Sequence, residues 1–309
     1  MNTAKTQPPG RKVLLSGASG MVGTALRAAL VERGDSVVQL VRRETAGSNE
    51  LRWQPTAAMP VPAAALEGFD AVIHLSGANL AARRWTAEYR REIVASRVES
   101  TRALGAMLAR LQQVPRAFLA ASAIGFYGDR GDRAVDESSA PGVGFLAEMC
   151  RAWEDATGPA EAAGMRVTHL RFGVALAPHD GALAKMLPLF RLGLGGRLGS
   201  GKQWMSWIAL GDLVAAVLFV LDSNGLPGAV NLTSPQPVTN EEFTRALARV
   251  LHRPAMLPAP AFALRIALGP MADEALMLST RVAPARLLKA GFRFEYPEIE
   301  GALREMVSR

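Results

Sequence analysis

The chain has 309 residues, of which 49% are hydrophobic and 20% charged, a balance that gives a globular protein ample material for a core. Its formal net charge is +7, but the arginines are scattered among acids, which favours a basic surface facing small anionic ligands over a nucleic-acid partner. The one cysteine, Cys150, excludes an internal disulfide, and no apolar run is long enough to span a bilayer.

These features predict a cytoplasmic protein with no membrane partner and no nucleic-acid partner. Residues 1–11 are polar, contain two adjacent prolines and lack the apolar stretch of a secretory signal. We therefore expect them to form a disordered lead-in.

The first predicted elements form a β-turn-α-β unit. A strand at Val13–Ser16 leads into a glycine-rich turn and then a helix over Met21–Glu32, where apolar residues recur at helical spacing. Gly34 ends that helix, and Val37–Val41 is the second strand. Further strands are predicted at Ala71–Leu75, Ala117–Ala121 and Val167–Phe172, with helices between them at about Thr86–Leu111 and Gly144–Ala163.

This alternation predicts an α/β fold: a Rossmann-type, doubly wound parallel sheet over residues 12–175. Residues 176–309 are expected to form a smaller α/β substrate-binding part with a helical extension, which can return strands or helices to the Rossmann domain. After Phe172 we expect a loop or hairpin at Gly193–Gly201, a helix at Gly211–Leu221, a strand at Val230–Leu232, a helix at Asn240–Leu251 capped by Thr239 or Asn240, and a connector at Pro254–Pro260.

The turn after the first strand has the spacing of a dinucleotide site. Gly17 permits a tight turn, Gly20 lets the backbone approach a pyrophosphate, and Gly23 lets the helix pack closely on the strand. The helix N-terminus offers free N–H groups to the phosphates. The predicted contacts are Gly17, Ala18, Ser19, Gly20, Met21, Val22 and Gly23; the alternative is a tight turn without a ligand.

The end of the second strand bears on the choice of cofactor. It reads Val41-Arg42-Arg43, where NAD enzymes usually place an acid that binds the ribose 2′-hydroxyl. Guanidinium groups instead bind a 2′-phosphate, so the sequence favours NADP(H) over NAD; the alternative is two solvated arginines. A third small-residue turn, Leu75-Ser76-Gly77-Ala78, is predicted to border the adenosine and ribose.

Several motifs together resemble the extended short-chain dehydrogenase/reductases, the NAD-dependent epimerase/dehydratase family. They are the glycine turn, HLSGA, SAIGFYG followed by DE, and GSGKQWMSWIALGDL at Gly199–Leu213. The segments RWTAEYRREIVASRVESTRAL and APARLLKAGFRFEYPEIEGAL are similar to one atypical subgroup with a distinctive C-terminal extension. The resemblance extends from Lys12 to near the C-terminus and implies a Rossmann fold with NADP(H) as cofactor.

The sequence departs from that family at its catalytic residues. The family's Tyr-x-x-x-Lys pair aligns with Leu146 and Cys150, and neither side chain can act as the family's acid/base or its fixed cation. The usual catalytic hydroxyl aligns with Ala123. Met205 and Ala209 replace the arginine and histidine of the substrate motif, which argues against a nucleotide-sugar substrate.

Three residues remain candidates for chemistry. Ser122 could contact the cofactor or donate a proton, and Glu148 could replace the missing acid/base if it is buried. Arg97 could hold an anion or a helix carbonyl. Each has a structural alternative, a solvated or salt-bridged residue, and the four dispersed histidines give no metal-ligand spacing.

The sequence thus leaves two functions open. The first is an NADP(H)-dependent oxidoreductase or epimerase that acts on an unidentified small substrate. The second is a non-catalytic NADP(H)-binding sensor or scaffold, in which Trp204, Trp207 or Phe145 seals the nicotinamide face. A homodimer is expected from the family resemblance only.

Overall fold

The computed structural model describes residues 10–55, 61–223 and 225–308. Most of the predicted lead-in at residues 1–11 lies outside this part of the chain. Within it, no helix is both long enough and apolar enough to cross a membrane.

The centre of the molecule is a seven-stranded sheet in which all the strands run parallel. Its strands, in spatial order, are β11 (Gly228–Leu232), β7 (Arg166–Phe172), β5 (Ala117–Ala123), β4 (Ala71–His74), β1 (Lys12–Ser16), β2 (Ser36–Val41) and β3 (Glu50–Arg52). The predicted doubly wound Rossmann fold is confirmed. The chain order reverses at β1, whose neighbours are β2 and β4, and such a switch point is where open α/β sheets bind ligands.

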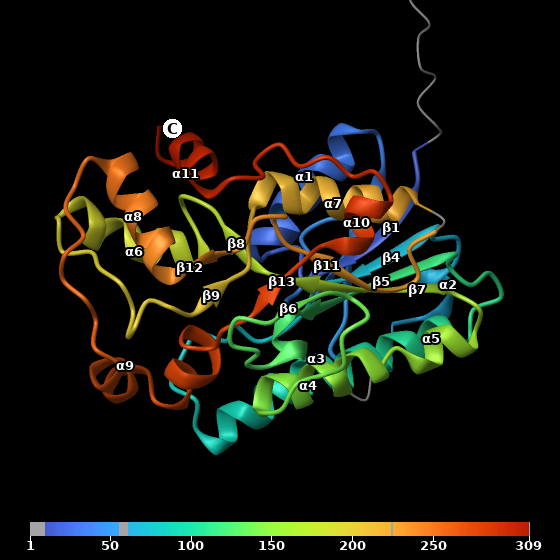
Figure 1. The fold of residues 1–309 in the computed structure, drawn as a ribbon. Helices are drawn as coiled ribbons and strands as arrows, with labels where there is room; N and C mark the ends of the chain where they lie inside the picture. The colour runs from blue at the N-terminus through green and yellow to red at the C-terminus, as the bar shows by residue number, and fades with distance from the viewer. Residues whose placement is uncertain (1–9, 56–60, 224, 309) are drawn as a thin grey trace, which may run out of the picture.

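Helices cover both faces of the sheet (Figure 1). One face packs against α1 (Met21–Glu32), α7 (Leu210–Asp222) and α10 (Ala285–Lys289). The other packs against α3 (Ala87–Leu108), α4 (Phe145–Asp155) and α5 (Gly158–Ala162), with the short α2 (Ala63–Leu66) nearby. Near-continuous apolar strands such as Val13–Leu15 fit a sheet that is buried on both faces.

The single helix predicted at Gly144–Ala163 is two helices. The chain leaves the first at Ala156, and Pro159 stands in the first turn of the second. Proline has no N–H to donate to the preceding turn, so it fits the start of a new helix better than the interior of a long one.

The remaining elements form a smaller lobe beside the sheet (Figure 1). It contains β8 (Val174–Leu176), α6 (Gly181–Arg191), β9 (Trp204–Met205), β10 (Trp207–Ala209), β12 (Val238–Thr239), α8 (Asn240–Leu251) and α11 (Ile299–Ser308). Thr239 is the N-cap of α8, in a reciprocal capping box with Glu242. The helix α6 was not predicted, because Gly181 and the internal Pro188 weaken its helical signal.

The chain after residue 175 also returns to the Rossmann part. Strand β11 joins the sheet edge, and β13 (Arg281–Val282) pairs with β6 (Ala134–Val135). Between α8 and β13 lie α9 (Ala261–Leu268) and the π-helix η2 (Ala272–Leu276), while the 3-10 helix η1 (Ile124–Tyr127) directly follows β5.

Candidate functional site

The three glycines after β1 have different structural roles. A Cβ atom at Gly17, whose φ is +74°, would lie 2.7 Å from the carbonyl carbon of Leu75, and one at Gly23 would lie 2.1 Å from the Gly17 oxygen. Packing of the chain itself therefore requires these two. A Cβ atom at Gly20 would lie 3.6 Å from its nearest neighbour, and the residue is exposed. The space beside its Cα is therefore open to a ligand.

The N-terminus of α1 is equally open. Gly20 is its N-cap, no side-chain cap is found among the described residues, and the first turn contains no acid. The hydroxyl of Thr24 donates to the Ala18 carbonyl at 3.1 Å and fixes the turn from within. Free N–H groups at the positive end of a helix dipole suit a phosphate group, so this turn fits the pyrophosphate of a dinucleotide.

The structure distinguishes the two arginines after β2. Arg43 forms a forked ion pair with Glu50 on β3, at 2.8 and 2.5 Å, and also donates to the Glu44 carbonyl. The Glu44 carboxylate in turn pairs with Arg52. Arg42 is exposed and, within the described residues, its side chain forms no ion pair, so it is the guanidinium that remains available to an anion.

The third predicted segment, 75–78, lies against the glycine turn and is held from α3. Arg97 donates to the Ala78 carbonyl at 2.9 Å and to the Ile93 carbonyl at 3.1 Å, while the Ala78 N–H donates to Ser96 at 3.0 Å. A Cβ at Gly77 would lie 3.0 Å from the guanidinium carbon of Arg97. Arg97 is only 8% exposed, and burial lowers its pKa. Its hydrogen bond to the Ala78 carbonyl holds this segment against α3.

The positions that align with the family's catalytic pair lie in an apolar cluster. Leu146 and Cys150 on α4 are buried among Ala121, Phe126 and Tyr127. Burial, and to a lesser extent the nearby charge of Glu154, raises the pKa of the Cys150 thiol to about 12. At neutral pH neither residue exchanges a proton with a substrate.

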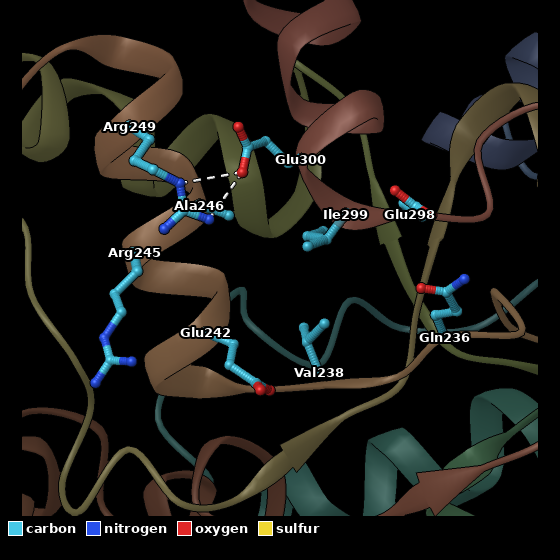
Figure 2. A pocket seen from close by; sticks show the side chains of 9 residues that line it. All are labelled: Gln236, Val238, Glu242, Arg245, Ala246, Arg249, Glu298, Ile299 and Glu300. Atoms are coloured by element: carbon cyan, nitrogen blue, oxygen red, sulfur yellow. Dashed lines mark hydrogen bonds and ion pairs between the residues drawn. The ribbon is translucent and has the colours of Figure 1, made fainter.

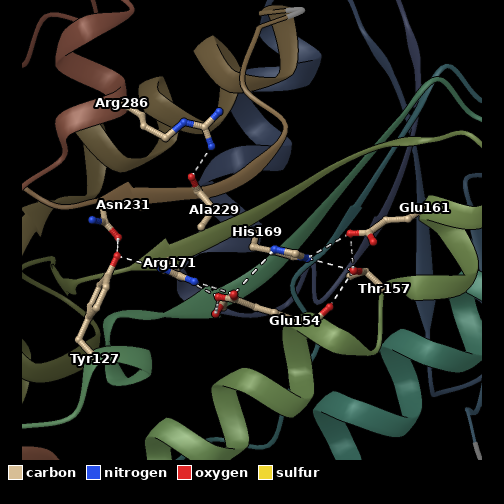
Figure 3. A network of polar contacts seen from close by, with 10 residues as sticks. Tyr127, Glu154, Thr157, Glu161, His169, Arg171, Ala229, Asn231 and Arg286 are labelled. Atoms are coloured by element: carbon tan, nitrogen blue, oxygen red, sulfur yellow. Dashed lines mark hydrogen bonds and ion pairs between the residues drawn. The ribbon is translucent and has the colours of Figure 1, made fainter. Parts of the chain in front are cut away.

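A buried polar row crosses the sheet close to this cluster. Ser122 on β5 is in register with Arg171 on β7, which is in register with Asn231 on β11. Arg171 donates to both carboxylate oxygens of Glu154 on α4, and the Tyr127 hydroxyl donates to Asn231 at 2.7 Å (Figure 3). Sequence reasoning missed this network, because no local pattern relates a helix acid to a strand arginine.

The network changes the interpretation of two predicted candidates. The Ser122 hydroxyl is buried and donates to Glu154 at 2.7 Å, which leaves it no proton for a ligand. Glu148, on the same helix as Glu154, is exposed and so lacks the burial that the acid/base role requires. Tyr127 is fully buried, and its hydroxyl joins Asn231 to Arg171 within the network, which is a structural role.

The three aromatic residues considered as a seal over the nicotinamide differ in burial. Trp207 is buried and donates to the Gln236 carbonyl, whereas Trp204 is half-buried and donates to Asp132 at 3.0 Å. Phe145 packs edge-on against Trp85. In the part of the chain that the structure describes, no group of His, Cys, Asp and Glu is placed to hold a metal ion.

A pocket lies elsewhere, between α8 and α11 (Figure 2). Its volume is about 310 Å³, and its lining is Gln236, Val238, Glu242, Arg245, Ala246, Arg249, Glu298, Ile299 and Glu300. Arg249 is paired with Glu300 at 2.8 Å. None of this lining comes from the glycine turn or the ends of β2 and β4, so we do not assign the dinucleotide to this pocket.

Comparison with known proteins agrees with this geometry. Residues 13–233 match the NAD dependent epimerase/dehydratase family, and residues 259–306 match a domain of unknown function, DUF1731. The chain is 45% identical to an epimerase family protein of Mycobacterium tuberculosis, over 96% of this chain and 98% of the relative. It is 33% identical to the human epimerase family protein SDR39U1, over 96% of this chain and 100% of the relative.

Two solved structures are similar throughout the chain. The crystal structure of human SDR39U1 with NADPH has a TM-score of 0.85 and 30% identity, covering 96% of this chain and 99% of that one. A nucleoside-diphosphate sugar epimerase from Corynebacterium glutamicum has a TM-score of 0.76 and 35% identity, covering 96% of this chain and 58% of that one. The chain therefore belongs to the NAD dependent epimerase/dehydratase family, a family that binds nicotinamide dinucleotides.

Proposed function

We propose that this protein binds NADP(H) across the switch point of its sheet and is an oxidoreductase or epimerase acting on a small substrate. The observation that carries the proposal is the open edge formed by Gly20 and Arg42. Gly20 faces free space at an uncapped helix N-terminus, and Arg42 has no acidic partner among the described residues. The human relative was crystallised with NADPH, which supports the same cofactor here.

Each part of this edge has a separate role in binding. The N–H groups around Gly20 would hold the pyrophosphate, and Arg42 would pair with the 2′-phosphate. Arg97 fixes segment 75–78 beside them through the Ala78 carbonyl. We infer that the cofactor part comprises residues 12–175 together with β11, in a cytoplasmic protein.

The bound cofactor would supply a hydride, and the protein would orient it and exclude competing reactions. The residues at the family's acid/base positions, Leu146 and Cys150, are buried; leucine has no ionisable proton, and the Cys150 thiol keeps its proton at neutral pH. Ser122 is committed to Glu154. We therefore propose that any proton the reaction needs comes from the solvent or from the substrate itself.

A second candidate function follows from the same α4 residues. A protein that binds NADP(H) without turning it over needs no acid/base, and the apolar cluster at Leu146 and Cys150 fits that role equally well. A crystal structure with NADPH separates the two functions. An open path to the nicotinamide C4 favours the enzyme, whereas a nicotinamide face sealed by side chains favours the sensor.

The binding proposal itself is tested by titrating NADPH into the wild-type protein and the Gly20→Asp variant. The aspartate side chain would extend into open space, so the variant should fold. Its charge would repel the pyrophosphate, so NADPH binding should be lost. Gly211→Asp is the matched control, since Gly211 is also exposed in a first helical turn and has no atom within 4 Å of a built Cβ. Equal affinity of Gly20→Asp and wild type would refute this assignment.

A further inference from the structure

The positive charge of this chain is concentrated in two segments. Residues 181–211 and 243–272 together contain eight Lys and Arg and not one Asp or Glu. The rest of the chain has 27 Lys and Arg against 28 Asp and Glu, so it is close to neutral. The net charge of +7 therefore comes from these two segments.

The fold brings the two segments side by side in the smaller lobe. The Leu257 N–H donates to the Gly195 carbonyl at 3.3 Å, and the Ala259 N–H donates to the Arg197 carbonyl at 2.9 Å. The Arg253 side chain donates to the Arg191 carbonyl at 3.0 Å. Two backbone hydrogen bonds and one side-chain hydrogen bond thus join the two segments into one surface.

The same segments carry most of the exposed large apolar side chains of the described residues. Helix α9 has no buried residue at all, and Phe262 and Ile266, one turn apart, are 65% and 70% exposed. We define the apolar–basic face as Leu189, Leu192, Leu194, Met256, Leu257, Phe262 and Ile266 together with Lys185, Arg191, Arg197, Lys202 and Arg253. Seven of the ten exposed large hydrophobic residues found in the structure belong to it, which marks the face as a contact surface.

Among the residues that the structure describes, the cations of this face form no ion pair. Three further arginines of segment 243–272 form ion pairs and are not counted in the face: Arg245 with Glu241, Arg249 with Glu300 and Arg265 with Asp273. For the five cations of the face, no ion pair is found among the described residues, and the Arg191 carbonyl accepts a hydrogen bond from Arg253. The face therefore presents apolar side chains beside uncompensated positive charge.

The combination of apolar side chains and positive charge favours some binding partners of this face over others. In a two-fold dimer the face would meet itself, which would place five cations opposite five others at an apolar contact. An anionic lipid surface complements both features, because apolar side chains enter the headgroup boundary while Lys and Arg contact lipid phosphates. We propose that the apolar–basic face docks this protein on anionic membrane surfaces.

The proposal revises the expectation of no membrane partner, and it does so without a spanning segment. Docking would use exposed side chains of α6, the connector after α8, and α9, which lie along one edge of the smaller lobe (Figure 1). It is independent of the NADP(H) assignment, because no residue of the face belongs to the glycine turn or to β2.

The test is cosedimentation of the full chain with vesicles of phosphatidylcholine alone and of phosphatidylcholine mixed with phosphatidylglycerol. We expect binding to the anionic vesicles only, and a severalfold loss of binding when salt is raised. Phe262→Ser with Ile266→Ser, and separately Lys185→Glu with Arg191→Glu, should each lower the bound fraction at least severalfold. The matched controls Val31→Ser with Val143→Ser, and Arg102→Glu with Arg110→Glu, should bind like wild type, since these residues are exposed elsewhere.

Thermal unfolding and circular dichroism of every variant show whether it is folded. Three results would overturn the proposal: no binding to anionic vesicles, equal binding to neutral and anionic vesicles, or equal losses in face and control variants. A fourth is a wild-type dimer, seen by sedimentation velocity, that Phe262→Ser with Ile266→Ser converts to a monomer. That result would assign the face to a second copy of this chain.

Discussion

The guanidinium of Arg171 on β7 donates two hydrogen bonds, each 2.8 Å long, to the carboxylate of Glu154 on α4. Both side chains are buried, and Glu154 also accepts the Ser122 hydroxyl. This ion pair attaches α4 to the sheet. The same helix carries Leu146 and Cys150 at the positions of the family's catalytic Tyr and Lys. In this chain, buried polar groups near that helix thus serve to hold the fold.

Removing the charge of Glu154 should destabilise the protein strongly. Glu154→Gln leaves the guanidinium of Arg171 buried without a carboxylate, and breaking a buried pair in this way costs about 3–5 kcal/mol of unfolding free energy. Urea unfolding of both proteins measures the loss.

The matched control is the double variant Glu154→Leu with Arg171→Met, which removes both charges and keeps apolar volume. It should be more stable than Glu154→Gln, since no buried charge is left unpaired. If Glu154→Gln unfolds within about 0.5 kcal/mol of wild type, the pair does not hold α4 in place.

The buried ring of His74 should make stability depend on pH. Burial lowers the pKa of His74 to about 4, and the ring shares hydrogen bonds with Ser16 at 2.6 Å and Ser100 at 3.2 Å. An exposed histidine in the unfolded chain has a pKa of about 6.5. As pH falls, the unfolded state takes up a proton first, so this contribution is complete above about pH 6.5 and is lost towards about pH 4.

When pH falls from about 7.5 to about 5, the unfolding free energy should decrease by about 2 kcal/mol because of this single ring. His74→Gln keeps a polar side chain that does not protonate, so its unfolding free energy should fall less over the same interval. His169, whose pKa is also lowered by burial, is present in both proteins and cancels in the comparison. An equal fall in both proteins would show that His74 does not titrate in this way.

The clamp of Arg97 on segment 75–78 should matter for cofactor affinity. Arg97→Lys keeps the charge but cannot reach the Ala78 and Ile93 carbonyls together, because an ammonium lacks the planar fork. We expect NADPH to bind about tenfold more weakly, which corresponds to about 1.4 kcal/mol. Hydrogen exchange at residues 75–78 should increase in parallel.

Arg102→Lys, an exposed substitution on the same helix, is the control for that experiment. It should leave both affinity and exchange unchanged. Faster exchange in Arg97→Lys at wild-type affinity would show that segment 75–78 does not border the cofactor.

The sequence predicted the Rossmann core well because its signals are local. A strand, three spaced glycines and an amphipathic helix lie within 21 residues of chain, from Lys12 to Glu32, and the structure confirms those elements. The strand at Val230–Leu232 was also predicted, but its place at the sheet edge beside β7 depends on pairing across about 60 residues.

The candidate site was harder to predict because its partners are distant in the sequence. Arg42 and Arg43 look alike in the sequence, and only the pairing of β3 with β2 brings Glu50 to Arg43, while Arg42 has no ion-pair partner in the part of the chain that the structure describes. In the sequence Ser122 is likewise a candidate proton donor, but in the fold it donates to Glu154, which lies 32 residues further along the chain. Tertiary contacts decide which polar side chains remain free, and no pattern of spacing encodes them.

The most direct test of the account is the cofactor preference of Arg42→Gln. A charge-assisted hydrogen bond contributes about 1.5–3 kcal/mol, so this variant should bind NADPH about 10- to 100-fold more weakly than wild type, while NADH binding stays within about twofold. Arg102→Gln, measured by the same calorimetric titration, should match wild type for both cofactors. A wild type that prefers NADH, or an Arg42→Gln variant with undiminished affinity for NADPH, would contradict the assignment of this edge to the 2′-phosphate.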